Sequence, residues 1–173
     1  MSHRVVITGI GAITPVGNTI PEIWNNIKNG YCGIDYIKGF DEWDLPIKVA
    51  GQLKNFNPEE FGISRKEAIK NDKFCIYAYA TAYQAMLDSG LVSGENIAPE
   101  RLGVYIGSGI GGMDTFVKES NKLYNEGVKF ISPPFIPTII ANIASVNVAI
   151  KYNAQGPTRP GVTACATGTH EIG

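Results

Sequence analysis

Cys165 lies between a short stretch with β-branched residues, 161–164, and a stretch of small residues, 166–169. A turn from strand to helix of this kind exposes the nucleophile in other α/β enzymes. A thiol attacks as its thiolate, and the free N–H groups at a helix N-terminus favour that anion. Small residues on both sides leave room for a bulky acyl thioester. Cys165 is therefore a candidate nucleophile for acyl transfer, while the local pattern alone also fits a buried cysteine that packs as a small hydrophobe.

The other reactive residue types have plainer interpretations. His170 follows Cys165 by five residues, which on a helix turns its side chain about 140° away. Cys32 lies in a glycine-flanked loop, and Cys75 follows Phe74 in a helical pattern, so we expect both to be structural. Three cysteines without a close pair predict neither a disulfide framework nor a CxxC metal site.

Alternating apolar stretches must position these side chains. Residues Thr19 with Glu22, and Ser64 with Glu67, are capping boxes at the start of helical patterns. We expect helices at 20–29, from the second capping box to Gly90, and at 135–152, and strands at 4–8, 47–51, 102–106 and 161–164. The pattern predicts an α/β fold with a mainly parallel sheet and helices on both faces.

A glycine-rich loop, 107–112, follows the expected strand at 102–106. Its glycines would let a backbone segment or a ligand approach closely.

Composition bounds the class of protein. The 173 residues include 15 basic and 16 acidic ones without a long run of either sign, so charge gives no reason to expect a nucleic acid or a membrane surface as partner. The N-terminus lacks the apolar stretch of a signal peptide, and no later stretch approaches a membrane span. The expected compartment is the cytoplasm, and the expected organisation is one domain.

Several motifs occur in order along the whole chain. They are residues 5–11 with 14–18, 107–112, 131–133 with 135–137, 156–157, and the Thr-Ala-Cys-Ala-Thr-Gly run at 163–168. In these motifs the chain resembles the N-terminal half of the β-ketoacyl-[acyl-carrier-protein] synthases, specifically the synthase II type of fatty-acid biosynthesis.

This resemblance implies a fold and a reaction. Residues 1–173 would be an N-terminal ketoacyl synthase domain without its C-terminal half, in the thiolase-like condensing-enzyme fold with α-β-α-β-α layers, and the protein would be a homodimer. An acyl group would pass from acyl carrier protein to Cys165. The carbanion left when malonyl-carrier protein loses carbon dioxide would then attack that thioester, giving 3-oxoacyl-carrier protein. The resemblance implies no metal or redox cofactor.

The resemblance also assigns binding residues. Ile110 and Phe135 match positions of the acyl pocket and subunit interface, with plain core packing as the alternative for Phe135. A second set matches the region that receives the phosphopantetheine-bearing carrier protein, with a solvated helix face as the alternative for each residue: Arg65, Lys66, Lys70 and Lys129. The family's two catalytic histidines lie in its second half, so we expect the 173-residue chain alone to be inactive in condensation.

Four residues depart from the family pattern. Pro160 and Gly161 stand where the family has a small residue and then a β-branched one, in the strand that pairs across the dimer. Proline donates no hydrogen bond and glycine weakens a strand, so the sequence questions this edge. Asn71 replaces the usual methionine, and Glu171 is an unusual charge soon after Cys165.

Three competing functions remain. A dinucleotide-binding protein is suggested by Gly9 and Gly11 after the first expected strand, but Thr14 stands where G-x-G-x-x-G needs its third glycine. A non-catalytic partner subunit would typically lack the cysteine, which this chain retains. A truncated product would expose apolar surface of the 135–152 helix and tend to aggregate.

Overall fold

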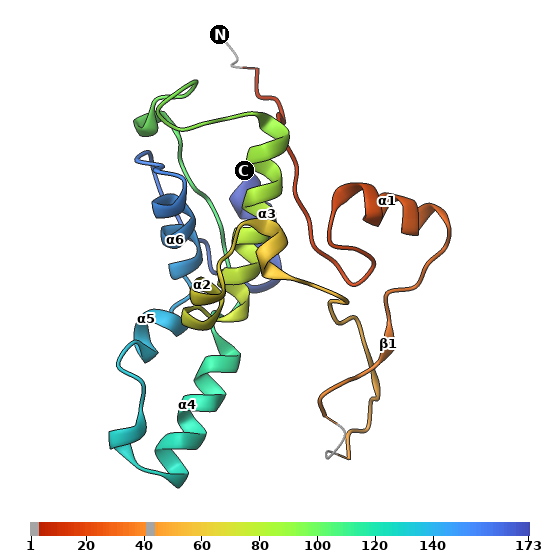
Figure 1. Cartoon of the computed structure of the whole chain (residues 1–173), viewed down its shortest axis with the longest axis vertical. Coiled ribbons are helices and arrows are strands. Elements are labelled where there is room, and N and C mark those ends of the chain that lie inside the picture. Colours follow the sequence, from red (N-terminus) through yellow and green to blue (C-terminus); the bar gives the residue numbers. More distant parts are fainter. Residues whose placement is uncertain (1–3, 41–43) are drawn as a thin grey trace.

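The long helix α3 (Lys73–Ser89) supplies Ile76, Tyr79 and Ala80 to the buried core of this computed structural model, which describes residues 4–40 and 44–173. Helix α6 (Ile143–Lys151) packs along it, and Figure 1 shows α3 at the centre with α4 and α5 below and α1 to one side. The remaining elements are α1 (Ile20–Lys28), β1 (Asp35–Tyr36), β2 (Val49–Ala50), η1 (Pro58–Phe61), α2 (Arg65–Lys70), η2 (Pro99–Arg101), α4 (Met113–Asn125), η3 (Val128–Phe130), α5 (Phe135–Ile139), η4 (Ala164–Ala166) and α7 (Thr167–Ile172).

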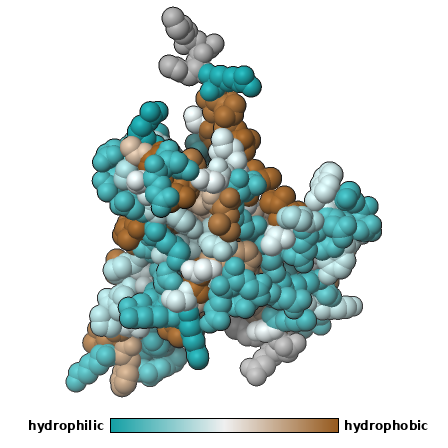
Figure 2. Space-filling view, turned by 45° about the horizontal axis from the view of Figure 1, so that its top comes forward, coloured by the Kyte–Doolittle hydropathy of each residue, from teal (hydrophilic) through white to brown (hydrophobic). Residues whose placement is uncertain are grey.

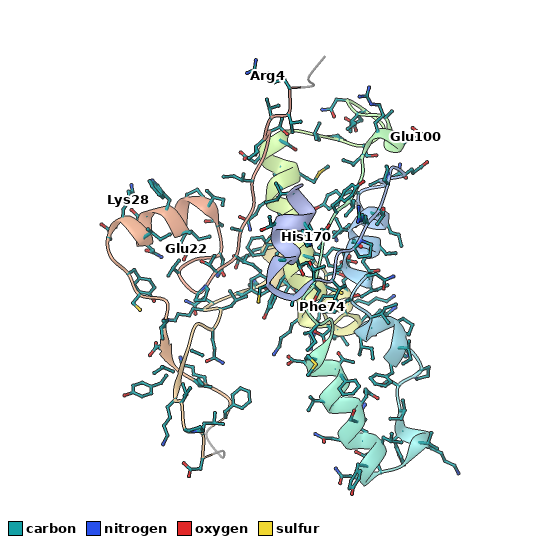
Figure 3. The ribbon with its side chains drawn as sticks, turned by 180° about the vertical axis from the view of Figure 1, so that it is seen from behind. Arg4, Glu22, Lys28, Phe74, Glu100 and His170 are labelled. Carbon is teal, nitrogen blue, oxygen red and sulfur yellow. The ribbon has the colours of Figure 1, made fainter. Side chains whose placement is uncertain are left out.

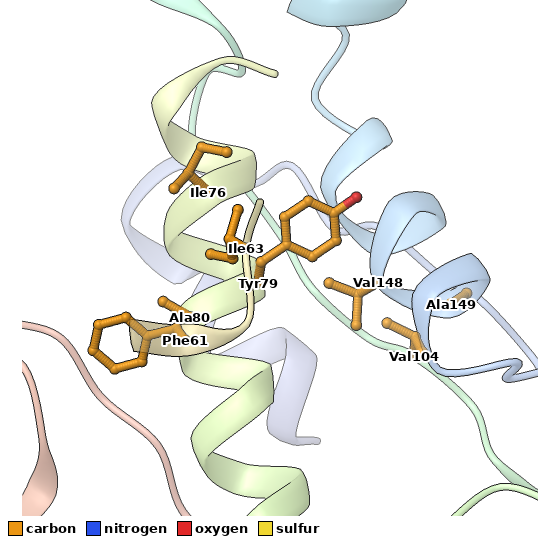
Figure 4. Close-up of a cluster of buried hydrophobic side chains, with 8 residues drawn as sticks. All are labelled: Phe61, Ile63, Ile76, Tyr79, Ala80, Val104, Val148 and Ala149. Carbon is orange, nitrogen blue, oxygen red and sulfur yellow. The ribbon is translucent and has the colours of Figure 1, made fainter. Parts of the chain in front are cut away.

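The buried core lies where α3 meets α6 and the segment around η1. Figure 4 shows its side chains, which are Phe61, Ile63, Ile76, Tyr79, Ala80, Val104, Val148 and Ala149. The small side chains of Ala80, Ala144 and Ser145 are almost completely buried, which lets the two helices approach closely.

Helix α1 confirms the prediction for residues 20–29. The Thr19 hydroxyl accepts a hydrogen bond from the Glu22 N–H, whereas the Glu22 carboxylate accepts from the N–H of Asn18 rather than from that of Thr19. Trp24 and Ile27 are exposed, so α1 does not bury its apolar face on the first expected strand. Figure 1 accordingly shows α1 standing apart from α3.

The helix expected from Ser64 to Gly90 is two helices, α2 and α3. The capping box is confirmed: Ser64 and Glu67 exchange both of its hydrogen bonds at the start of α2. The prediction of one continuous helix was wrong, because Asn71 adopts an extended backbone. Asp72 then caps α3 by accepting a hydrogen bond from the N–H of Phe74. The second oxygen of the buried Asp72 carboxylate accepts from the N–H of Thr115, near the start of α4.

An ion pair ties α2 to α6. The Lys151 ammonium lies 2.8 Å from the Glu67 carboxylate and also donates to the carbonyl of Gly62. Lys151, with further hydrogen bonds from Ser64, lowers the pKa of Glu67 to about 2. The same ammonium lies 5.1 Å from the centre of the Tyr79 ring, so it joins three parts of the chain.

The helix expected at 135–152 is also two helices, α5 and α6. The break lies at residues 140–142, where Ile140 has an extended backbone. The carbonyl of Ile139 accepts a hydrogen bond of 3.0 Å from the N–H of Gly112 instead of one from the next turn of a continuous helix. A contact from a distant loop therefore sets the break.

Of the expected strands, the one at 47–51 is present as β2, which pairs antiparallel with β1. Residues 4–8, 102–106 and 161–164 form no ladder within the described part of the chain, where a parallel bridge joins Val104 to Thr158. Strand pairing needs a neighbour that donates and accepts. Among the described residues, 102–106 has only a short contact of this kind, in which the Val104 N–H donates to the carbonyl of Pro157 and the Val104 carbonyl accepts from the N–H of Arg159, while 4–8 and 161–164 belong to no ladder or bridge. The predicted mainly parallel sheet is therefore not assembled among the described residues.

Apolar side chains stand exposed along the N-terminal segment. Val5 is 90% exposed and Ile7 86%. Figure 2 shows hydrophobic surface directly below the grey N-terminus. Among the described residues, no helix is both long and apolar enough to cross a membrane.

Glycines in the loop before α1 allow a close approach to α3. A Cβ on Gly9 would overlap the carbonyl oxygen of Ala85, and one on Gly11 would overlap that of Thr81. The glycines that suggested a dinucleotide fingerprint thus pack against helix backbone.

The loop at 107–112 likewise meets backbone, and this yields a prediction. Gly111 has a φ of +83°, and a Cβ there would overlap the carbonyl oxygen of Ile139. We expect Gly111→Ala to destabilise the protein by about 1–3 kcal/mol. Gly109→Ala is the control, since a Cβ there meets nothing within 4 Å. Urea unfolding of both variants measures the difference, and equal midpoints would contradict the expectation.

Candidate functional site

Cys165 is exposed in the middle of η4, the single turn that leads into α7. Ala164, immediately before it, has a φ of +49°, a backbone conformation that residues with a side chain rarely adopt. Strained backbone of this kind is typical of turns that present a functional group. The helical side of the predicted turn is confirmed, while the segment before it is unpaired.

Two threonines hold the turn. Thr167 is buried, and its hydroxyl accepts a hydrogen bond of 2.9 Å from the N–H of Thr163. The Thr163 hydroxyl in turn shares a hydrogen bond of 2.8 Å with Nδ1 of His170. Figure 3 shows His170 on α7 from behind the view of Figure 1. Sequence reasoning missed the threonine pair, although its i,i+4 spacing across the turn was a signal.

His170 thus has a structural partner. Its ring bonds Thr163, and no bond to Cys165 is present among the described residues. The expectation that His170 does not act as the base for Cys165 stays a prediction.

Gly161 and Glu171, two of the departures from the family pattern, lie against each other. The Glu171 carboxylate lies over Gly161, where a Cβ would overlap its oxygen Oε1. The same oxygen would be 3.0 Å from a Cβ on Gly107. A β-branched residue at position 161 would therefore displace Glu171, so the glycine and the charged side chain compensate one another.

The third departure, Asn71, is also explained. Its carbonyl oxygen accepts a hydrogen bond of 2.9 Å from the side chain of Asn147 on α6, and its amide donates to the carbonyl of Glu67. The polar residue therefore joins the α2–α3 junction to α6, a role that methionine could not fill.

Phe135 and Ile110 lie in different surroundings. Phe135 begins α5, and its ring lies 6.2 Å from that of Phe116 on α4. It lines a cavity of about 550 Å³ between α4, α5, α6 and the end of α2. Ile110 is 68% exposed and is not part of this lining. Their roles in an acyl pocket stay predictions.

The basic residues assigned to a carrier protein fall into two groups. Arg65, Lys66 and Lys70 are exposed on α2, and Lys70 reaches the edge of the 550 Å³ cavity. Lys129 is exposed on η3, which Figure 1 shows beside the lower part of α4. A docking surface that includes all four stays a prediction.

Helix α4 and its buried carboxylate were missed by sequence reasoning. Met113, Phe116, Val117 and Leu123 recur at helical spacing, which was the available signal for α4. Glu119 on this helix is 3% exposed and accepts hydrogen bonds from Lys122 and from both the N–H and the hydroxyl of Ser132. Lys122 first, and then the Ser132 N–H, lower the pKa of Glu119 to about 2.

The remaining cysteines lie in different surroundings. Cys75 is buried in α3, and burial raises the pKa of its thiol to about 12, so it stays protonated. Cys32 is exposed in its loop, with its sulfur 3.9 Å from the carbonyl of Ile34. Within the described ranges, no group of three or more His, Cys, Asp or Glu side chains could hold a metal ion.

Comparison with known proteins gives concordant matches. The family model described as "Beta-ketoacyl synthase, N-terminal domain" matches residues 2–173. The 3-oxoacyl-[acyl-carrier-protein] synthase 2 of Staphylococcus aureus (strain COL) is 46% identical over 172 residues, which are 99% of this chain and 41% of the relative. The synthase of the same name from Synechocystis sp. is 43% identical over 98% of this chain and 40% of its own length.

Solved structures agree on the fold. A β-ketoacyl synthase from Burkholderia phymatum superposes with a TM-score of 0.82 at 25% identity, over 96% of this chain and 41% of its own. A ketosynthase solved with its type II polyketide acyl-carrier protein superposes with the same TM-score of 0.82 at 23% identity, over 99% of this chain and 46% of its own. These neighbours confirm the predicted α/β, thiolase-like class. The chain spans about 41% of the length of the curated relatives it matches first.

The contact between Gly161 and Glu171 generates a prediction. We expect Gly161→Ala to destabilise the protein by about 1–3 kcal/mol, because the new methyl group overlaps the Glu171 carboxylate. Adding Glu171→Ala should restore most of the loss, a coupling that a double-mutant cycle of urea unfolding measures. Gly168→Ala on α7 is the control, since a Cβ there meets nothing within 4 Å. Additive effects would show that the two residues are independent.

Proposed function

The chain belongs to the β-ketoacyl synthase family, and from that premise we propose that it supplies the nucleophile-bearing N-terminal domain of a 3-oxoacyl-[acyl-carrier-protein] synthase of the synthase II type. The observation that carries the proposal is the exposed Cys165 on a strained turn, inside the motif Thr-Ala-Cys-Ala-Thr-Gly at 163–168. Because the chain spans 41% of the length of the curated relative from Staphylococcus aureus, the complete reaction is proposed for the complete protein.

The proposed chemistry is two successive transfers. The Cys165 thiolate attacks the thioester carbonyl of an acyl carrier protein, its S–C bond forms, and the carrier's thiol leaves. Malonyl-carrier protein then loses carbon dioxide, and the resulting carbanion attacks the acyl-Cys165 carbonyl. The new C–C bond gives a 3-oxoacyl-carrier protein, lengthened by two carbons, and frees the Cys165 sulfur.

The geometry of the turn supports the first transfer. Cys165 projects from a turn whose backbone is fixed by the Thr163–Thr167 hydrogen bond. An exposed thiol on a fixed turn is open to an acyl thioester carried by a second protein, whereas the buried Cys75 is not.

We propose acyl carrier protein as the partner, from the names of the relatives and from the charges on α2. The curated relatives are named for acyl carrier protein, and a solved ketosynthase of the same fold is in complex with one. The three exposed cations of α2, Arg65, Lys66 and Lys70, suit an acidic partner. The same proposal includes fatty-acid biosynthesis and a cytoplasmic location, as expected from the sequence.

A homodimer is part of the proposal. Ile110, Phe116 and Tyr124 expose apolar side chains along the glycine loop and α4. Exposed apolar surface can mark a contact with another protein. A second copy of the chain would cover them, together with the edge containing Pro160 and Gly161 that the family resemblance assigns to the dimer.

Acyl loading tests the nucleophile. On incubating the complete protein with a labelled acyl-carrier protein, we expect mass spectrometry to find the acyl group on Cys165. Cys165→Ala should abolish loading and lower condensation by about a thousandfold or more, because no other thiol replaces it. Cys32→Ala, at the other exposed cysteine, is the matched control and should load normally. Acylation of Cys32, or of neither cysteine, would refute the assignment.

Charge reversal tests the docking surface. We expect Lys66→Glu with Lys70→Glu to raise the KM for acyl carrier protein by about tenfold at low salt with kcat unchanged, because both substitutions repel an acidic partner. The difference should shrink as salt screens the charges. Lys28→Glu, on the exposed face of α1, is the control. An unchanged KM would place the carrier protein elsewhere.

A further inference from the structure

Glu119 is a charged side chain placed inside the protein, and both of its oxygens are engaged. Oε1 accepts from the Lys122 ammonium at 2.6 Å and from the Ser132 hydroxyl at 2.9 Å, and Oε2 accepts from the Ser132 N–H at 2.8 Å. A buried carboxylate is costly unless its hydrogen bonds are made, so this arrangement fixes all three groups.

The carboxylate holds the segment that leads to Phe135. Ser132 lies three residues before Phe135, and its carbonyl accepts a hydrogen bond of 2.9 Å from the N–H of Phe135. One serine therefore connects Glu119 on α4 to the first residue of α5. A shift of Ser132 would be passed directly to the Phe135 backbone.

A second contact fixes the direction of the Phe135 ring. Phe116 and Glu119 are three residues apart on α4 and share one helix face. The Phe116 ring lies 6.2 Å from the Phe135 ring, with 30° between their planes. Thus α4 grips the 132–135 segment at two points, one polar and one aromatic.

These residues line a common space. Glu119, Lys122, Ser132 and Phe135 all border the cavity of about 550 Å³, which Ile143 and Asn147 of α6 also line. The shape of this cavity depends on where α4 holds the segment.

We propose that Glu119 is a positioning residue that, through Ser132, sets the place of the Phe135 ring and thereby the length of acyl chain the protein accepts. This inference rests on the proposed function and on the expectation, drawn from the family resemblance, that Phe135 borders the acyl pocket. Both carboxylate oxygens of Glu119 are engaged by Lys122 and Ser132, so the proposed role of Glu119 is exerted through the position of Phe135. Its effect therefore falls on selectivity, and a contact that merely stabilised α4 would leave selectivity unchanged.

The test is the chain-length profile of the complete protein. The value of kcat/KM is measured with a series of saturated acyl-carrier proteins from short to long. Glu119→Gln keeps the shape but places an amide NH₂ where an acceptor is needed, so the Ser132 segment loses part of its anchor. We expect the ratio of long-chain to short-chain kcat/KM to change by about tenfold, mainly through KM, while kcat for the preferred chain stays near wild type.

Two further variants sharpen the result. Ser132→Ala removes the hydroxyl and keeps the N–H, so it should shift the chain-length profile in the same direction by a smaller factor. This variant leaves the charge of Glu119 in place. Combined with Glu119→Gln it should add little, because both act through one contact. Glu126→Gln, at the exposed end of α4, is the matched control and should leave the profile unchanged.

The outcomes separate the two proposals. Wild-type protein that condenses, with Glu119→Gln and Ser132→Ala both keeping its chain-length profile, would overturn this inference and leave the proposed function intact. Wild-type protein that never forms acyl-Cys165 would overturn the proposed function and this inference with it. Hydrogen exchange supplies a readout independent of activity, since faster exchange at residues 131–136 in Glu119→Gln is expected if the anchor acts as described, and equal exchange contradicts it.

Discussion

Close packing of α6 on α3 is the contact on which the other parts of the described chain depend. It is possible because Ala80, Ala144 and Ser145 are small enough to let the two helices meet, with Tyr79 and Val148 filling the space beside them. The glycines of the N-terminal loop then pack on the next turns of α3, and Lys151 at the end of α6 reaches α2. The turn that carries Cys165 packs against Gly107, where an added Cβ would overlap the side chain of Thr167. The candidate nucleophile thus stands on a turn that lies close against the glycine-rich loop.

Local signals in the sequence were sufficient wherever the chain determines its own structure. The caps at Thr19 and Ser64 predicted where α1 and α2 begin, and the motif around Cys165 predicted a turn into a helix. The two helix breaks were not predicted, because each involves a tertiary contact. At the α5–α6 break the Gly112 N–H donates to the carbonyl of Ile139, and at the α2–α3 break the Asn71 side chain accepts a hydrogen bond from Asn147. The expected strands at 4–8, 102–106 and 161–164 have suitable residues, but pairing is a property of neighbours and not of a segment.

The site shows the same division. Cys165 was identifiable because its motif is contiguous, and Cys75 because a helical pattern surrounds it. Glu119 was not identifiable, because a glutamate three residues before a lysine normally indicates a solvated helix face. Its burial follows from Ser132, a partner thirteen residues away that only the folded chain brings to it. Glu171 had been noted as unusual, and the structure supplies the reason in the space above Gly161.

Asp72 is one carboxylate at the start of two helices. One oxygen accepts from the N–H of Phe74 in the first turn of α3, and the other accepts from the N–H of Thr115 in the first turn of α4. Each helix N-terminus carries a partial positive charge, so two such ends brought together would repel without an anion between them. Asp72 acts as the shared counter-ion of the two helix ends. If either end opened, the carboxylate would lose one of the two N–H donors that hold it in place, and the other helix end would be less well capped. The arm formed by α4, η3 and α5 is therefore coupled electrostatically to α3, and the two should fray or hold as one cooperative unit.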